Sequence, residues 1–186
     1  MFPPPPLTIW SVGHSTHTLE GLLAVLAPSG IELVADIRTV PKSRRHPHFH
    51  TDQLARSLPA HGLRYVHLAR LGGWRAPRPD SPNGAWRNRS FRGYADYALT
   101  GEFADGLAEL RAHAARARTA MMCSEALWWR CHRRLVADRL VAGGDRVLHI
   151  GSDGRTSEHR VAPFAVPAAG GALVYPAEAT GAAGAT

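Results

Sequence analysis

The chain has 186 residues, 45% of them hydrophobic and 20% charged, a composition typical of one globular domain and not of a disordered or fibrous protein. Its apolar runs are too short to cross a bilayer and its start lacks the pattern of a secretory signal, so we expect a cytoplasmic protein with no membrane partner. The formal net charge of +7 favours an acidic partner, although general arginine enrichment of solvent-exposed faces explains it equally well.

In chain order, short apolar segments typical of buried strands alternate with segments of helical periodicity. The predicted strands are residues 7–12, 31–35, 63–68, 119–123 and 146–150. The predicted helices are residues 18–26, a helix that begins near Leu54 and ends at Gly62, residues 94–97 with 103–117, and about 126–142. This alternation predicts a Rossmann-like three-layer α/β sandwich, with a mostly parallel sheet of about five strands and helices on both faces.

A single α/β domain is expected at residues 8–165. It follows a proline-rich segment at 1–7 and precedes an alanine- and glycine-rich segment at 166–186, which we expect to be partly flexible. Residues 72–93 show no periodicity, and an irregular stretch of that length in a compact domain is typical of a lid or a binding loop.

The carboxyl ends of parallel strands meet at one edge of a sheet, where ligands bind in this fold class. That rule gathers four side chains suited to acid–base or nucleophilic chemistry, which we predict as catalytic: His14, Asp36, Cys123 and Glu125. In this scheme Glu125 or Asp36 is the general base, His14 a proton donor or orienting group, and Cys123 the nucleophile.

Glycine and arginine residues near these side chains predict an anion site. Gly13-His14-Ser15 fits a tight strand-to-helix turn beside a ligand, although a simple helix cap has the same pattern. Asp36 and Arg38 share one face of an extended segment, where they bind a ligand or pair with each other. Arg44 and Arg75, in the loops that follow, are predicted as further anion clamps.

Both cysteines are predicted to be free thiols, since a reduced compartment disfavours a disulfide. Six residues separate Cys123 from Arg130. A phosphatase-like loop, which has a shorter spacing and no carboxylate such as Glu125 inside it, is therefore not expected. Cys131 is interpreted as a small buried residue on a helix. His132 would follow it there and point about 100° away, so no metal ligands are predicted.

A series of short motifs resembles one known family. The motifs are Gly13-His14-Ser15; Asp36-Ile37-Arg38 with Pro41, Ser43 and Arg44; Tyr65 and His67 before Leu71-Gly72-Gly73 and Arg75; Tyr94-Ala95-Asp96-Tyr97; Cys123 with Glu125 and Cys131-His132-Arg133; and His149-Ile150 with Asp153-Gly154-Arg155 and His159. On these residues the chain is similar, over about residues 8–165, to the domain of unknown function 488 family.

The resemblance implies an α/β fold and a shared pocket, and it carries no settled activity. With the strand-end rule it gives the expected ligand-binding residues, which are Gly13, Ser15, Arg38, Ser43, Arg44, His67, Gly72, Gly73, Arg75, Tyr94, Tyr97, Cys131, His132 and Arg133. Ser124 and Trp128-Trp129 depart from the family pattern around the acidic residue, which implies a pocket rim of different shape.

We therefore expect an enzyme or ligand-binding protein that acts on an acidic or phosphate-bearing partner, a nucleotide or a nucleic acid. Two alternatives stay open. One is a non-catalytic nucleic-acid-binding module, for which the basic loops suffice. The other is a metal- or haem-binding protein that uses cysteine and histidine side chains. The sequence predicts neither a particular cofactor nor an oligomeric state.

Overall fold

The computed structural model describes residues 5–41 and 46–177. These form a six-stranded sheet with the order β3-β2-β4-β1-β5-β6. Five strands are parallel: β1 (Thr8–Gly13), β2 (Leu33–Asp36), β3 (Arg64–His67), β4 (Thr119–Cys123) and β5 (Arg146–Ile150). The sixth, β6 (Thr156–Glu158), pairs antiparallel with β5 and extends the sheet beyond the five strands predicted.

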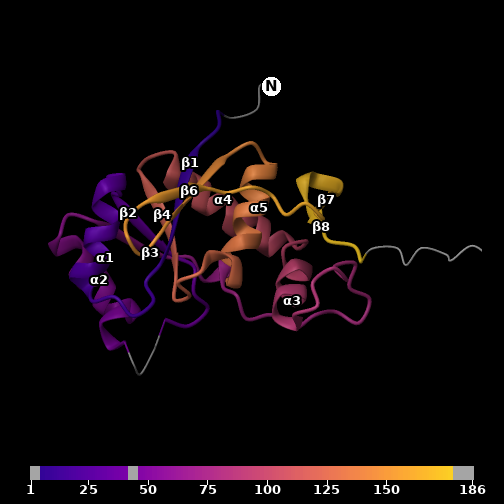
Figure 1. The fold of residues 1–186 in the computed structure, drawn as a ribbon, viewed down its shortest axis with the longest axis horizontal. Helices are drawn as coiled ribbons and strands as arrows, with labels where there is room; N and C mark the ends of the chain where they lie inside the picture. Colours follow the sequence, from indigo (N-terminus) through magenta and orange to yellow (C-terminus); the bar gives the residue numbers. More distant parts are fainter. Residues whose placement is uncertain (1–4, 42–45, 178–186) are drawn as a thin grey trace, which may run out of the picture.

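Helices cover both faces of this sheet (Figure 1). One face packs against α1 (Leu19–Leu26) and α2 (Thr51–Ala60), and the other against α3 (Arg89–Tyr97), α4 (Gly101–Ala114) and α5 (Arg133–Ala142). Successive side chains of a strand point to opposite faces of the sheet. Val34 therefore packs in the hydrophobic core beneath α1 and α2, whereas Ala35 packs in the core beneath α4 and α5. The predicted three-layer α/β sandwich is confirmed.

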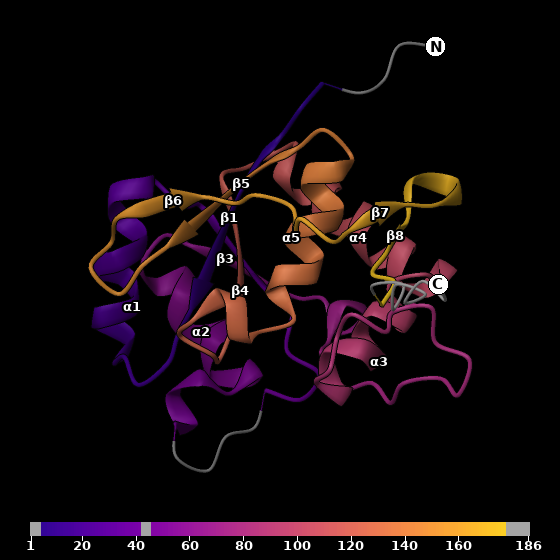
Figure 2. The ribbon, with the colours of Figure 1, turned by 45° about the vertical axis from the view of Figure 1, so that its right-hand side comes forward.

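The connections between strands open a crevice at one edge of the sheet. The chain leaves β1 through α1 on one face, and it leaves the neighbouring β4 through α5 on the opposite face (Figure 2). Right-handed crossovers in opposite directions require this arrangement. The loops after β1 and β4 therefore separate at the carboxyl ends of the strands, which is where α/β sheets bind their ligands.

The prediction of a helix from about residue 126 is wrong over its first part, because α5 begins at Arg133. Residues 124–132 form a loop with a single 3-10 turn, Trp128–Arg130. The guanidinium of Arg133 donates hydrogen bonds to the backbone carbonyls of Glu125 and Ala126, and the carboxylate of Glu125 accepts one from the amide of Leu127. These side-chain contacts take the place of helical hydrogen bonds. Cys131 consequently precedes the helix instead of lying on its face.

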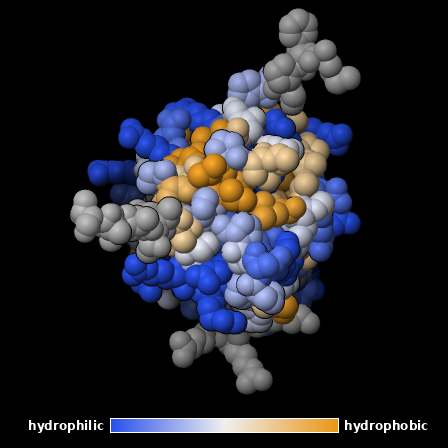
Figure 3. All heavy atoms as spheres, turned by 90° about the vertical axis from the view of Figure 1, so that its right-hand side faces the viewer, coloured by the Kyte–Doolittle hydropathy of each residue, from blue (hydrophilic) through white to orange (hydrophobic). Residues whose placement is uncertain are grey.

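Residues after 165 continue onto the side of the molecule that carries α5. The strands β7 (Val166–Pro167) and β8 (Leu173–Val174) form a small hairpin, and the buried Tyr175 donates a hydrogen bond to Asp138 of α5. Figure 3 faces this side and shows apolar side chains gathered on its surface. Residues 178–186, part of the segment expected to be flexible, lie outside the described residues.

The predicted irregular stretch is shorter than expected, since residues 89–93 already belong to α3, whose first turn Asn88 caps. Among the described residues, no helix combines the length and the hydropathy needed to span a bilayer.

Candidate functional site

Two adjoining hollows lie at the carboxyl ends of β1, β2 and β4. We name the first the thiol pocket; it has a volume of about 280 Å³ and is lined by Arg38, Thr39, Val40, Gly73, Trp74, Ser90, Phe91, Tyr94, Cys123, Ser124, Glu125, Arg130, Cys131 and His132. The second, the histidine hollow, has a volume of about 550 Å³ and is lined by His14, Ser15, Thr16, Arg38, Val40, His46, Trp74, Ser124, Glu125 and Ala126. They share five lining residues and so form one cleft.

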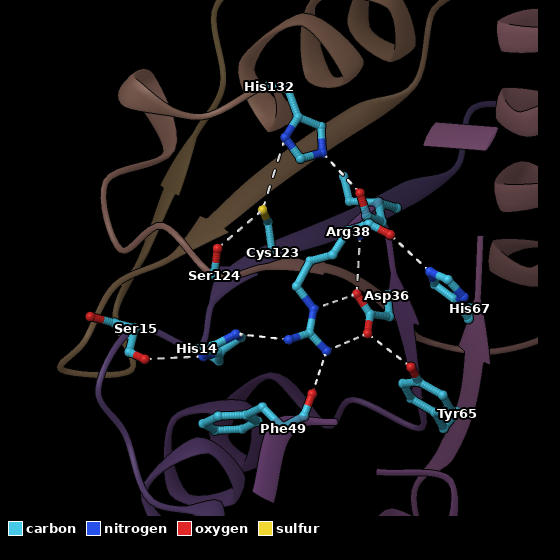
Figure 4. Close-up of polar contacts among 11 residues, drawn as sticks. His14, Ser15, Asp36, Arg38, Phe49, Tyr65, His67, Cys123, Ser124 and His132 are labelled. Atoms are coloured by element: carbon cyan, nitrogen blue, oxygen red, sulfur yellow. Dashed lines mark hydrogen bonds and ion pairs between the residues drawn. The ribbon is translucent and has the colours of Figure 1, made fainter. Parts of the chain in front are cut away.

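Asp36 holds Arg38 at the base of the cleft (Figure 4). The fully buried carboxylate accepts hydrogen bonds from Nε of Arg38 at 2.8 Å, from its Nη2 at 2.5 Å, from its backbone amide at 3.1 Å, and from the hydroxyl of Tyr65 at 2.8 Å. Burial and the negative charge of Asp36 raise the pKa of Tyr65, so this hydroxyl stays a donor. With four donors around it, the carboxylate positions Arg38 and has no free lone pair with which to act as a base.

His14 supports the same guanidinium from the other side. Its Nε2 lies 3.1 Å from Nη1 of Arg38, and since a guanidinium only donates, Nε2 accepts and Nδ1 carries the proton that bonds to the carbonyl of Ser15 at 3.0 Å. Burial, and then the charge of Arg38, lower the pKa of His14 to about 4, so the ring is neutral at pH 7. Both ring nitrogens are thus engaged within the protein.

The turn after β1 brings the backbone of these residues against β4. The amides of His14 and Ser15 donate to the carbonyls of Cys123 and Ser124 at 2.9 and 3.0 Å. Ser15 adopts a left-handed conformation with φ of 45°, a region that residues other than glycine rarely occupy. Such conformations concentrate at functional turns, where the surrounding contacts enforce them.

Two cysteines and a histidine form the inner wall of the thiol pocket. Nε2 of His132 lies 2.9 Å from the carbonyl oxygen of Ile37, to which it donates, and this leaves Nδ1 with a lone pair. That Nδ1 faces both sulfurs, at 3.9 Å from Sγ of Cys123 and 3.6 Å from Sγ of Cys131. The three ligand atoms lie within 4.8 Å of one another.

Arg133 stabilises negative charge on this wall. Only 1% of the residue is exposed, and its Nε donates to Sγ of Cys131 at 3.4 Å, while Nη1 donates to the hydroxyl of Ser11 at 3.2 Å. Within residues 5–41 and 46–177 it forms no ion pair with a carboxylate. Burial alone would raise the pKa of Cys131, but hydrogen bonding from Cys123 and the charge of Arg133 outweigh it and lower that pKa to about 6.

The pKa of the other thiol, Cys123, shifts in the opposite direction. Its hydrogen bond to Cys131, followed by burial, raises the pKa of Cys123 to about 12. At neutral pH the pair therefore holds one proton, with Cys123 as donor and the sulfur of Cys131 as the more anionic of the two.

The outer rim of the cleft carries exposed side chains of several kinds. Trp74 is 80% exposed, and its backbone is fixed by a hydrogen bond from its amide to the hydroxyl of Thr39 at 3.2 Å. Arg130 and Glu125 also line the cleft and are exposed, so the rim offers a ring, a cation and a carboxylate to anything bound inside.

The structure brings many of the predicted site residues to the cleft. Its lining includes His14, Ser15, Arg38, Gly73, Tyr94, Cys123, Glu125, Cys131 and His132. Gly13, Asp36, His67, Gly72, Arg75, Tyr97 and Arg133 are not among the lining residues, and Ser43 and Arg44 lie outside the described residues.

The predicted residues that do not line the cleft contact its walls or pack beside it. His67 donates to the carbonyl of Arg38 at 2.8 Å, and the guanidinium of Arg75 lies over the ring of Tyr97 at 3.9 Å from its centroid. The sequence predictions missed Thr39, Val40, Trp74 and Arg130 as lining residues. The signal was available for Thr39 and Val40, which follow Arg38 directly at the end of β2, and for Trp74, which follows Gly72-Gly73.

Comparison with known proteins agrees with the resemblance seen in the motifs. No curated protein and no solved structure matches the chain significantly. The family model described as a domain of unknown function, DUF488, matches residues 18–140, which include β2, β3, β4 and the cluster of thiols. Since this match covers most of the chain, the protein belongs to the DUF488 family.

Proposed function

We propose that the cleft binds a phosphate-bearing small molecule of nucleotide size. We further propose that the protein is an enzyme whose reactive groups lie in the thiol pocket. The observation that carries this proposal is the position of Arg38, whose guanidinium is held rigidly in the wall that both hollows share. Ligand pockets in proteins usually have volumes of about 300–1,000 Å³, a range that the connected hollows match.

Arg38 is prepared to receive an anion. Asp36, His14 and the carbonyl of Phe49 accept four of the five side-chain N–H groups of a guanidinium, and the remaining hydrogen of Nη1 has no acceptor in the described part of the chain. A donor fixed in advance loses little conformational entropy when it binds a phosphate oxygen. Arg130 and His46 add cationic or donor groups along the same cleft, against the single carboxylate of Glu125.

Trp74 supplies a surface for a planar ring. A tryptophan that is 80% exposed beside a polar cleft is unusual for a side chain of this size, and exposed apolar surface of that kind marks binding sites. Stacking of a base on an aromatic side chain is worth about 1–3 kcal/mol. An anion site next to a stacking surface favours a nucleotide over an inorganic anion.

The test is a binding titration with a panel of mononucleotides and the matching nucleosides, followed by calorimetry. We expect mononucleotides to bind and nucleosides to bind at least about tenfold more weakly, because a phosphate bonded to Arg38 contributes a charge-assisted hydrogen bond. Trp74→Ala should weaken mononucleotide binding about 5- to 150-fold, the equivalent of the stacking energy. Arg130→Gln should weaken it as well, and the phosphate requirement should decrease.

Two matched variants serve as controls. Trp129→Ala removes another exposed tryptophan, and Arg116→Gln another exposed arginine, neither of which lines the cleft. Both should bind like the unaltered chain. Equal affinity for nucleotides and nucleosides, or equal losses in control and cleft variants, would refute the proposal. Tight, strongly salt-dependent binding of single-stranded DNA without mononucleotide binding would support the non-catalytic nucleic-acid-binding alternative instead.

A further inference from the structure

The spacing of the thiol cluster matches that of ligands around a metal ion. Around a tetrahedral zinc ion with Zn–S of about 2.3 Å and Zn–N of about 2.0–2.1 Å, neighbouring ligand atoms are separated by about 3.5–3.8 Å. Nδ1 of His132 lies 3.6 Å from Sγ of Cys131 and 3.9 Å from Sγ of Cys123. All three atoms lie within 4.8 Å of one another, so small side-chain rotations suffice to bring them around one ion.

The orientation of His132 is that of a metal ligand. Histidines that bind metals usually donate their second ring N–H to a carbonyl or carboxylate, which fixes the tautomer and the direction of the lone pair. Here Nε2 donates to the carbonyl of Ile37 at 2.9 Å, and Nδ1 is left facing the two sulfurs. The adjacent loop passes close to this nitrogen, and a side chain at Gly73 would block it, because a Cβ there would lie 2.4 Å from Nδ1.

The sulfur ligands have a comparable outer partner. Nε of Arg133 donates to Sγ of Cys131 at 3.4 Å, and N–H···S contacts of this kind orient a ligating sulfur. Arg133 is itself fixed by bonds to Ser11 and to the carbonyls of Glu125 and Ala126. The loop between Cys123 and Cys131 is therefore held in the conformation that brings both sulfurs to His132.

We propose that Cys123, Cys131 and His132 bind a divalent zinc-type ion, whose fourth position faces the thiol pocket. Two thiolates and one imidazole suit a borderline-soft ion such as Zn²⁺ better than Mg²⁺ or Ca²⁺. Three protein ligands with one open position are typical of catalytic and not of structural zinc sites. All three ligands line the thiol pocket, so a water molecule or an oxygen of the bound ligand occupies that position. The metal ion adds a reactive centre to the proposed function, but the proposal of a metal site rests only on the geometry of these three residues.

The test uses the full chain with any affinity tag removed, kept reduced, stripped of metal with a chelator and then incubated with Zn²⁺ alone. We expect elemental analysis after gel filtration to give about one zinc per chain. Co²⁺ in its place should give a thiolate-to-cobalt charge-transfer band and the visible bands of a tetrahedral ion. Cys131→Ser and His132→Gln should each lower zinc affinity by more than the roughly 10- to 100-fold that loss of an outer partner costs.

His61→Gln is the matched control, since His61 is exposed at the end of α2, away from the cluster. It should bind zinc like the unaltered chain, with circular dichroism confirming that every variant is folded. If the cluster variants fail to fold, alkylation of the unaltered chain decides the matter, because bound zinc should slow iodoacetamide labelling of both cysteines. A chain that takes up no zinc, a disulfide that forms in its place under reducing conditions, or cluster variants with undiminished affinity would overturn the proposal.

Zinc content and nucleotide binding report on separate proposals. Arg130→Gln should retain about one zinc per chain while it loses nucleotide affinity. If the zinc test fails, the proposal of an anion site is unaffected. If the nucleotide test fails, the proposal of a metal site is unaffected.

Discussion

Asp138 and His159 form a hydrogen bond of 2.7 Å between side chains that are both completely buried. The chain of contacts continues from Nδ1 of His159 to Nε2 of His149 at 2.9 Å, and the ring of His149 stacks on Trp128 with centroids 4.1 Å apart. Nδ1 of His149 is buried without a hydrogen-bond partner. Burial, and then the nearby His159 and Arg133, lower the pKa of His149 to about 3.

This buried histidine predicts how stability depends on pH. An unfolded histidine titrates near about 6.5, so below that pH the unfolded state binds a proton that folded His149 does not bind until about pH 3. The free energy of unfolding should therefore decrease as the pH falls below about 6.5, with His149 contributing up to about 1.4 kcal/mol per pH unit. His149→Gln should show a shallower decrease in urea titrations at pH 7, 6 and 5. His61→Gln, which changes an exposed histidine, should keep the full slope.

Asp36→Asn should destabilise the protein strongly, because it leaves the buried guanidinium of Arg38 without its counter-charge and presents an amide N–H₂ to donors. We expect a loss of about 3–5 kcal/mol in the free energy of unfolding. The matched change Asp52→Asn breaks an exposed ion pair with Arg56 and should cost less than about 1 kcal/mol. Urea unfolding of both variants makes the comparison, and equal losses would contradict the structural role given to Asp36.

Arg133→Met should loosen the loop over the thiol pocket. It removes donors from two backbone carbonyls, a hydroxyl and a sulfur, while it keeps an apolar stem in the buried site. We expect a loss of about 3 kcal/mol, because several buried acceptors lose their donor and each one left unsatisfied costs about 1–3 kcal/mol. Hydrogen exchange at residues 124–130 should become faster. Arg116→Met, on the surface, should change neither the free energy of unfolding nor the exchange rate of this loop. Unchanged exchange in the Arg133 variant would show that the conformation of the loop does not depend on Arg133.

The sequence predicted the parts of the site that follow from local patterns. Buried strands alternating with helices sufficed for the sheet, and the rule for strand ends brought His14, Arg38, Cys123 and Glu125 to one cleft. It did not predict how these side chains pair. Asp36 and His14 have residue types suited to proton transfer, yet in the fold the Asp36 carboxylate accepts from Arg38 and Tyr65. The Nε2 lone pair of His14 is directed at Arg38, and its ring N–H at the carbonyl of Ser15.

The environment of the cysteines depends on how the Arg133 side chain bonds to the loop that precedes it. Leu127, Cys131 and Leu135 have helical spacing, and periodicity alone favours a helix there. The guanidinium of Arg133 instead bonds to the carbonyls of Glu125 and Ala126, an interaction that no periodic pattern encodes. The helix prediction also separated Cys131 from His132 in direction, which is why the sequence did not predict that these two side chains and Cys123 lie together.

Gly13 is the position where the backbone of β1 passes closest to the loop that carries Glu125. A Cβ there would lie 2.0 Å from the carbonyl oxygen of Glu125 and 2.9 Å from Cα of Ala126, both of them backbone atoms that cannot rotate away. Gly13→Ala should therefore push the loop off β1, at a cost of about 1–3 kcal/mol or more, and weaken nucleotide binding with it. Gly101→Ala is the opposite case, since nothing lies within 4 Å of a Cβ in that first turn of α4.

Alanine restricts the unfolded chain more than glycine does, so Gly101→Ala should stabilise the protein by about 0.4–1 kcal/mol and leave binding unchanged. Both variants replace a glycine with alanine, but the expected changes in the free energy of unfolding have opposite signs, which thermal unfolding can resolve. A nucleotide titration should show weaker binding for Gly13→Ala alone. If Gly13→Ala proved as stable as the unaltered chain, the loop would have room to move away from β1. The close approach of β1 to the loop would then not be what holds Glu125 at the mouth of the cleft.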